Sequence, residues 1–121
     1  MMMTIILVVD DDPIVRDMVA LLLEDDGYQT IAACNGQEAL DYLHQQRPQL
    51  VMSDLLMPII DGWTLHRAMQ ANSSYASIPF VVMSSVYTPD FIQQRMMPAA
   101  VLRKPINAQR LLSTIRALLP P

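Results

Sequence analysis

The stretch Leu50-Val51-Met52-Ser53-Asp54-Leu55-Leu56-Met57-Pro58 joins an apolar run to a single aspartate and then to a Met-Pro turn. A short apolar run bounded by a turn signal is typical of a buried β-strand. Asp54 therefore stands at the carboxyl end of a predicted strand, Leu50 to Asp54, where burying an unpaired charge is costly. Other parts of the sequence must supply the groups that compensate this carboxylate.

Four more short apolar runs predict strands on either side of this one. They are Ile5 to Val9, Thr30 to Ala33, Phe80 to Ser84 and Val101 to Arg103. Helices are predicted to begin at capping side chains, two of them followed by proline, near Asp12, Asn35, Asp61, Thr88 and Asn107. Five alternations of strand and helix predict an α/β fold, with a parallel sheet and helices on both faces.

The helices are predicted from their apolar spacing and their stop signals. The first is expected to bury one face made of Val15, Met18, Val19, Leu22 and Leu23. The fourth must be short because Pro98 ends it, and the last is expected to halt at Pro120-Pro121. His44 and His66 lie within helical stretches and are both expected at the surface.

Length and composition indicate a single folded domain over residues 1–121, with no room for an output domain. Hydrophobic residues make up 52% of the chain and charged residues 17%, which excludes a disordered protein. The net charge of −4 argues against a nucleic-acid-binding surface. Cys34 is the only cysteine, and the N-terminus has neither a signal peptide nor a membrane span, so we expect a cytoplasmic protein.

Polar residues collect at the carboxyl ends of the predicted strands, where parallel sheets place their functional groups. They are Asp10, Asp11, Asp54, Ser84, Ser85 and Lys104. Three carboxylates in one place repel one another, and a divalent cation with oxygen ligands, such as Mg²⁺, relieves that repulsion. Lys104 is the only lysine in the chain, and its ammonium suits pairing with one oxygen of a phosphoryl group.

Four motifs in this order resemble the response-regulator receiver domain, the phosphoacceptor half of a two-component signalling pair. They are Val8-Val9-Asp10-Asp11, the segment Asp54 to Gly62, Ser84, and Lys104-Pro105. Each motif alone is weak, but all four at successive strand ends are specific. The resemblance covers essentially the whole chain. It implies a flavodoxin-like, doubly wound (βα)5 fold with strand order 2-1-3-4-5.

The resemblance also implies roles for individual residues. Asp54 would be the nucleophile that becomes an acyl phosphate. Lys104 would pair with Asp54 and then with the phosphoryl group, and the Ser84 hydroxyl would meet a phosphoryl oxygen after transfer. Mg²⁺ would be bound by Asp11, by Asp54 and by the backbone carbonyl of Leu56. Asp10 would assist, mostly through water.

The partners implied by the resemblance are a histidine kinase or a histidine phosphotransfer protein, which supplies the phosphoryl group from a phosphohistidine. The domain would act as a switch or relay, as a monomer or weak dimer. Its output would be a contact with another protein, without nucleic acid or membrane. It would catalyse only its own phosphorylation and dephosphorylation. Other possibilities are a receiver cut from a hybrid kinase and a receiver-like scaffold that is never phosphorylated.

Several positions depart from the family pattern. Receivers commonly carry an aromatic residue in the fifth strand that moves with the serine or threonine, and Val101 stands there in this sequence. Tyr87 is a possible substitute. Leu56 and Val86 offer no polar side chain to orient an attacking water, which predicts a phosphoryl-aspartate that lasts minutes or more. An aspartyl-phosphate phosphatase would need a second acid two residues after the nucleophile. Leu56 occupies that position, which argues against a phosphatase.

Overall fold

The computed structural model describes residues 3–119, so the predicted stop at Pro120-Pro121 falls outside the described residues. The elements are β1 (Ile5–Val9), α1 (Pro13–Asp25), β2 (Gln29–Ala33), α2 (Gly36–Gln45), β3 (Leu50–Asp54), α3 (Gly62–Gln70), β4 (Phe80–Ser84), α4 (Pro89–Arg95), β5 (Ala100–Arg103) and α5 (Ala108–Leu118). None of the helices within this range is both long and apolar enough to cross a membrane.

The five strands form one parallel sheet in the order β2-β1-β3-β4-β5, which confirms the predicted α/β fold and its topology. Strand order reverses between β1 and β3, and functional groups gather at such a reversal in open α/β sheets. The register places Val9 beside Ser53, Asp54 beside Met83, and Ser84 beside Arg103. The carboxyl ends of β1, β3, β4 and β5 therefore lie along one edge of the sheet.

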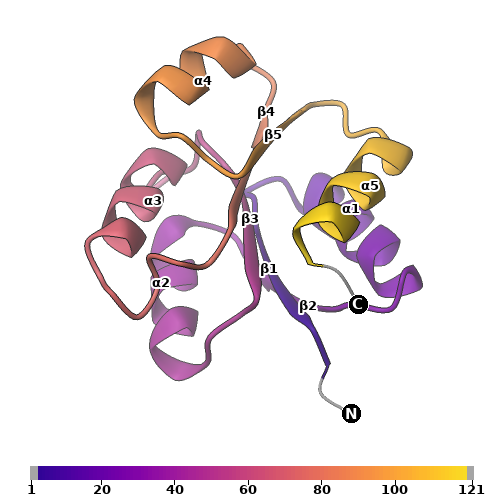
Figure 1. The fold of residues 1–121 in the computed structure, drawn as a ribbon, viewed down its shortest axis with the longest axis horizontal. Helices are drawn as coiled ribbons and strands as arrows, with labels where there is room; N and C mark the ends of the chain where they lie inside the picture. The colour runs from indigo at the N-terminus through magenta and orange to yellow at the C-terminus, as the bar shows by residue number, and fades with distance from the viewer. Residues whose placement is uncertain (1–2, 120–121) are drawn as a thin grey trace.

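Helices cover both faces of the sheet (Figure 1). On one face α1 and α5 pack through Val19, Leu23, Leu111 and Ile115. On the other face α2, α3 and α4 pack through apolar side chains that include Ala39, Leu43, Leu65, Met69 and Ile92. Alternate residues of β1, β3, β4 and β5 belong to the two clusters, because successive side chains on a strand point to opposite faces.

The predicted helix starts are confirmed by their capping hydrogen bonds. Asp12, Asp61, Thr88 and Asn107 each accept a backbone N–H of the first turn through a side-chain oxygen. At α2 the Asn35 side chain caps Glu38 N, as a capping box requires, but the Glu38 carboxylate accepts from Cys34 N rather than from Asn35 N. The hydrogen bond to the Glu38 side chain therefore comes from Cys34 N, one residue before the cap, instead of from the cap residue itself.

One detail of the predicted α1 face is wrong, because Met18 is 37% exposed. The buried residues of this helix are Val19 and Leu23, which are four apart and lie on the same face. Neighbouring residues on a helix point about 100° apart, so Met18 turns away from the face that carries Val19.

Candidate functional site

Lys104 joins the two carboxylates at the centre of the site. It directly follows β5, and its backbone N–H donates to the Ser84 carbonyl across 2.9 Å. Its Nζ donates to Asp10 Oδ2 at 2.7 Å and to Asp54 Oδ2 at 2.9 Å. The sequence predicted the pairing with Asp54, but the shorter contact, to Asp10, was not anticipated. One ammonium therefore bridges carboxylates from β1 and β3.

The remaining carboxylate oxygens are held by backbone N–H groups. Asp10 is fully buried, and its Oδ1 accepts from Asp12 N at 2.9 Å. Asp54 Oδ1 accepts from Leu55 N at 2.7 Å. Each carboxylate thus has one oxygen on the ammonium and one on the backbone, which fixes its orientation without help from solvent.

Burial has opposite effects on the two kinds of group in this cluster. Burial raises the pKa of Asp10, and the hydrogen bonds from Lys104 and from Asp12 N–H oppose that increase. Burial alone would lower the pKa of Lys104, but the hydrogen bonds to Asp10 and Asp54 outweigh it and raise the pKa above its ordinary value. The raised pKa of Lys104 favours its charged form, and the 2.7 Å contact pairs that ammonium with the Asp10 carboxylate.

Asp11 completes a cluster of three carboxylates. One oxygen of each of Asp10, Asp11 and Asp54 can be chosen so that all three lie within 4.8 Å of one another. Asp11 is exposed, and its carboxylate has no hydrogen-bond or ion-pair partner among residues 3–119. A set made only of oxygen atoms, one of them freely accessible, fits a hard cation such as Mg²⁺.

Ser84 lies at the end of β4, between Asp54 on β3 and Lys104 after β5. The side chain is buried, and its Oγ accepts from Val86 N at 3.3 Å and from Tyr87 N at 3.2 Å. The hydroxyl oxygen is therefore tied to the loop that leads into α4. Its proton is not used by these two bonds.

The loop between β3 and α3 depends on a glycine whose importance was not recognised in the sequence. The sequence indicates Gly62 only as the last residue of the motif that begins at Asp54, beside the helix start near Asp61. A Cβ at this position would lie 2.1 Å from the backbone oxygen of Asp54 and 2.8 Å from Leu55 Cα. The start of α3 therefore packs directly on the backbone of the candidate phosphoacceptor, and only glycine allows this approach.

An aromatic cluster joins α3 to the loop before α4. The Tyr87 ring stacks on Phe91, with centroids 5.0 Å apart and planes at 10°, and meets Trp63 edge-on at 5.5 Å. The guanidinium of Arg95 lies 3.7 Å from the Phe91 centroid. The four-residue spacing of Phe91 and Arg95 could have revealed their contact, because such residues are neighbours on a helix surface. Tyr87 precedes the helix, so its stacking could not be read from that spacing.

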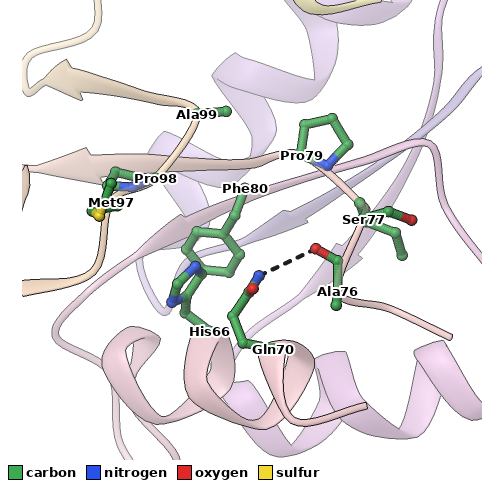
Figure 2. Close-up of a pocket in the computed structure, with 10 residues that line it drawn as sticks. His66, Gln70, Ala76, Ser77, Pro79, Phe80, Met97, Pro98 and Ala99 are labelled. Atoms are coloured by element: carbon green, nitrogen blue, oxygen red, sulfur yellow. Dashed lines mark hydrogen bonds between the residues drawn. The ribbon is translucent and has the colours of Figure 1, made fainter. Parts of the chain in front are cut away.

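His66 is buried, with 9% of its surface exposed, so its predicted surface position is wrong. Its ring packs edge-on against Phe80 at 4.9 Å, and burial lowers its pKa. It also lines a cavity of about 310 Å³ at the amino ends of β4 and β5 (Figure 2). The segment 97–99, which follows the short α4, forms the opposite wall of this cavity. The sequence pattern of α3 could not reveal the contact with Phe80, because that residue belongs to β4.

The comparisons with known proteins agree with this geometry. The pattern of the family described as the response regulator receiver domain matches residues 6–116. The chain therefore belongs to the response-regulator receiver domain family of two-component signalling. Among solved structures it is similar to the chemotaxis response regulator CheY4 of Vibrio cholerae. That likeness has a TM-score of 0.89 and 31% identity, and it covers 98% of this chain and 100% of the other.

Two curated relatives come from Synechocystis. Response regulator Rre1 is 37% identical over 117 residues, and the DNA-binding dual master transcriptional regulator RpaA is 34% identical over 116. Each match covers 94% of this chain but only 51% and 48% of the relatives, so the chain spans about half the length of these proteins. Since RpaA is named as DNA-binding, the expectation that this chain contacts no nucleic acid stays a prediction.

Proposed function

We propose that this domain is a phosphoacceptor switch or relay in which Asp54 takes a phosphoryl group from a phosphohistidine. The donor would be a histidine kinase or a histidine phosphotransfer protein, and phosphorylation would change the protein contacts of a monomer or weak dimer in the cytoplasm. The single observation that carries the proposal is the Lys104 ammonium, which bridges Asp10 and Asp54 beside the accessible carboxylate of Asp11.

In the proposed step, a carboxylate oxygen of Asp54 forms a bond to phosphorus. The P–N bond of the phosphohistidine breaks, its electron pair stays on the imidazole nitrogen, and the product is an acyl phosphate. Lys104 shifts its hydrogen bond from Asp54 to a phosphoryl oxygen while it keeps its contact to Asp10. Catalysis of this kind rests on positioning and on charge neutralisation rather than on proton transfer.

The residues that would hold Mg²⁺ are Asp11, Asp54 and the backbone carbonyl of Leu56, with Asp10 acting through water. When bound, the ion neutralises charge on the transferring phosphoryl group. Asp11 is suited to this role because its carboxylate is exposed and accepts no hydrogen bond within residues 3–119. Asp10 is already committed to Lys104 and to Asp12 N–H, which supports an indirect role.

The structural change caused by phosphorylation would be transmitted from the site through Ser84. If its hydroxyl turns to donate to a phosphoryl oxygen, the bonds that its Oγ accepts from Val86 N and Tyr87 N weaken. The Tyr87 ring would then shift against Phe91 of α4 and Trp63 of α3, which it contacts directly. This path would replace the movement of an aromatic residue in β5, where Val101 has no ring.

The proposed phosphorylation is tested by intact mass after incubation with acetyl phosphate and Mg²⁺. We expect a single phosphate adduct that is lost in Asp54→Asn and in the presence of EDTA. Asp61→Asn is the matched control, because Asp61 is a helix cap in the same loop and should leave the adduct unchanged. Absence of an adduct in the wild-type protein would overturn the proposal in favour of an unphosphorylated scaffold.

The persistence of the adduct is tested in the same way after the phosphodonor is removed. Leu56 and Val86 are exposed, apolar and placed just after Asp54 and Ser84, so no side chain there can orient an attacking water. We expect the adduct to last minutes or more. Decay within seconds would contradict this expectation, and Leu56→Gln should shorten the lifetime if water access is the limiting factor.

The proposed path through Tyr87 is tested by the fluorescence of Trp63, the only tryptophan in the chain. We expect acetyl phosphate and Mg²⁺ to change the emission of the wild-type protein but not of Asp54→Asn. Tyr87→Leu should still form the adduct and lose most of the emission change. An unchanged response in Tyr87→Leu would exclude this path without affecting the proposed chemistry at Asp54.

A further inference from the structure

One face of α3 carries a stripe of polar and aromatic side chains. The stripe consists of Trp63, His66, Arg67 and Gln70, which stand at positions i, i+3, i+4 and i+7. Residues at these spacings are neighbours on a helix surface. At a rise of about 1.5 Å per residue the stripe extends over roughly 10 Å. A ligand that contacts all of it must therefore be longer than a single six-membered ring.

Two surface cavities adjoin along this stripe. One, of about 310 Å³, lies between α3 and the amino ends of β4 and β5 (Figure 2). The other, of about 250 Å³, lies between α3 and the end of α4, where Arg95 and Met96 line it. Since His66 and Gln70 line both cavities, we call the two together the α3 groove. Its size falls within the range of about 300–1,000 Å³ that is usual for small-molecule sites.

His66 is a buried polar residue whose ring has no hydrogen-bond partner. The residue is only 9% exposed, and its ring nitrogens make no hydrogen bond within residues 3–119. Among the buried and half-buried residues of that range, Tyr42 Oη is the only side-chain nitrogen or oxygen that is sealed from solvent without a hydrogen bond. The unbonded nitrogens of His66 therefore reach solvent, and the α3 groove is the space that they face (Figure 2). Burial lowers the pKa of the ring, which favours the neutral form with one donor and one acceptor.

Two further residues of the larger cavity have unused hydrogen-bonding groups. Gln70 Nε2 donates to the Ala76 carbonyl at 3.3 Å, which leaves Oε1 and the second amide hydrogen unpaired (Figure 2). Ser77 Oγ accepts from Arg47 Nη2 at 2.9 Å, which leaves its hydroxyl proton free to donate. Apart from these two residues and His66, the residues that line this cavity are apolar. A planar heterocycle with donors and acceptors on one edge fits such a lining, because a side-chain amide can pair with that edge.

The other end of the α3 groove is cationic. Arg67 and Arg95 line it, are exposed, and make no ion pair within residues 3–119. Arg95 lies 3.7 Å from the Phe91 ring centroid, which restricts its guanidinium before a ligand arrives. Among the described residues, no carboxylate lines either cavity. Two guanidinium groups without a counter-charge favour a phosphate or a carboxylate, which they can bind through paired N–H donors.

We infer that the α3 groove binds a small molecule that joins a planar heterocycle to an anionic group, the class to which nucleoside monophosphates belong. The ring would lie in the larger cavity, against His66 and Phe80. The anion would bind Arg67 and Arg95 at the other end of the groove. An anion alone would leave the ring of His66 without a partner, and an uncharged ring would leave the two arginines without one. The inference goes beyond the proposed function and does not depend on it, because none of these residues belongs to the candidate phosphorylation site.

The test is isothermal titration calorimetry of the unphosphorylated full chain with AMP. EDTA is present, so that no divalent cation can hold the phosphate at the acidic cluster. We expect saturable binding with a Kd of about 1 mM or below. Adenosine and inorganic phosphate each supply one half of AMP and should bind at least about tenfold more weakly. Binding of AMP should also change the emission of Trp63, which lines the groove.

Variants at the two ends of the groove separate its two halves. Arg67→Gln and Arg95→Gln should each weaken AMP binding about fivefold and reduce the salt dependence of the affinity. His66→Phe should weaken AMP binding about tenfold and keep the salt dependence, because it removes hydrogen-bonding groups but no charge. Arg110→Gln is the matched control. It removes an exposed arginine of α5 outside the groove, and the affinity should stay within about twofold of the wild-type value.

Several results would overturn the inference. They are no binding of AMP up to about 10 mM, binding of adenosine or phosphate as tight as that of AMP, and an equal loss in Arg110→Gln and Arg67→Gln. Unchanged AMP binding in His66→Phe would overturn it too, because the ring is the buried group that the ligand must satisfy. Thermal unfolding of each variant identifies a loss of binding that results from a loss of fold. The two exposed arginine variants test the groove even if His66→Phe is unstable.

Discussion

The two ends of the parallel sheet are built differently. At the carboxyl ends, the Lys104 ammonium pairs with the Asp10 carboxylate at 2.7 Å and with the Asp54 carboxylate at 2.9 Å. At the amino ends of β4 and β5, by contrast, His66 faces a cavity of about 310 Å³, and the chain turns through Met97 with a φ of 51°. The charged end tolerates little change, whereas the cavity end has room to change without disturbing the chemistry.

The strongest test of this comparison is Gly62→Ala at the carboxyl end. A Cβ there would lie 2.1 Å from a backbone oxygen that cannot move without displacing Asp54, so we expect a loss of about 4 kcal/mol in the free energy of unfolding. Urea denaturation measures the loss. Gly27→Ala is the control, because nothing lies within 4 Å and only its φ of +98° is strained, at about 1 kcal/mol. Equal losses would contradict the tight packing inferred around Asp54.

The next largest effect is expected for Lys104→Met, which leaves the buried Asp10 without its ammonium partner. Breaking a buried ion pair costs about 3 kcal/mol or somewhat more. Asp10→Asn should cost less than Lys104→Met, because it leaves Lys104 paired with Asp54. The double variant should be more stable than Lys104→Met alone, since it removes the unpaired carboxylate. A double variant that shows the sum of both losses would mean that Lys104 stabilises the fold by packing rather than by charge.

The carboxyl end was largely predictable from sequence, because each of its residues follows a strand at a fixed position. Asp10, Asp54, Ser84 and Lys104 all lie where the pattern placed them. The Lys104–Asp10 contact was not predictable, because it depends on how far a side chain from β5 reaches across the sheet. The burial of His66 was missed for a similar reason, since the Phe80 ring that packs against it comes from β4 and reaches it through tertiary packing.

A smaller effect on stability is expected from relieving backbone strain in one loop at each end of the sheet. Ile59 has a φ of 71° and Met97 a φ of 51°, and both side chains are more than three-quarters exposed. Side chains other than glycine cost about 1–2 kcal/mol in this left-handed region. Glycine relieves the strain but increases the entropy of the unfolded chain, so Ile59→Gly and Met97→Gly should each stabilise by about 0.5–1 kcal/mol.

The control for these glycine variants is Leu56→Gly. Leu56 is also exposed, but its φ is not positive, so glycine there should be neutral or destabilising. Thermal unfolding at one pH is sufficient to rank the three variants. A loss of stability in Ile59→Gly would mean that its exposed side chain makes contacts that outweigh the backbone strain.

The smallest expected effect is a pH dependence of stability that comes from His66 at the cavity end. Burial lowers its pKa below the ordinary 6.5, so the folded state favours the neutral ring. A lowered pKa means that the full stability is present above the unfolded value of about 6.5 and is lost as pH falls through it toward the folded value. The slope cannot exceed about 1.4 kcal/mol per pH unit, since one proton is involved.

Urea denaturation at pH values from about 7.5 down to about 5.5 measures this dependence. This range extends about one unit on either side of the ordinary histidine pKa and stays above the pKa of most carboxylates. His66→Phe should remove the slope, because phenylalanine does not titrate and no carboxylate lines the cavity that His66 faces. The Phe80 ring offers the new side chain an apolar neighbour. His44→Gln changes an exposed histidine and should leave the slope unchanged. A slope that survives in His66→Phe would mean that another group takes up the proton, and Asp10 would not account for it, because a raised pKa makes stability rise as pH falls.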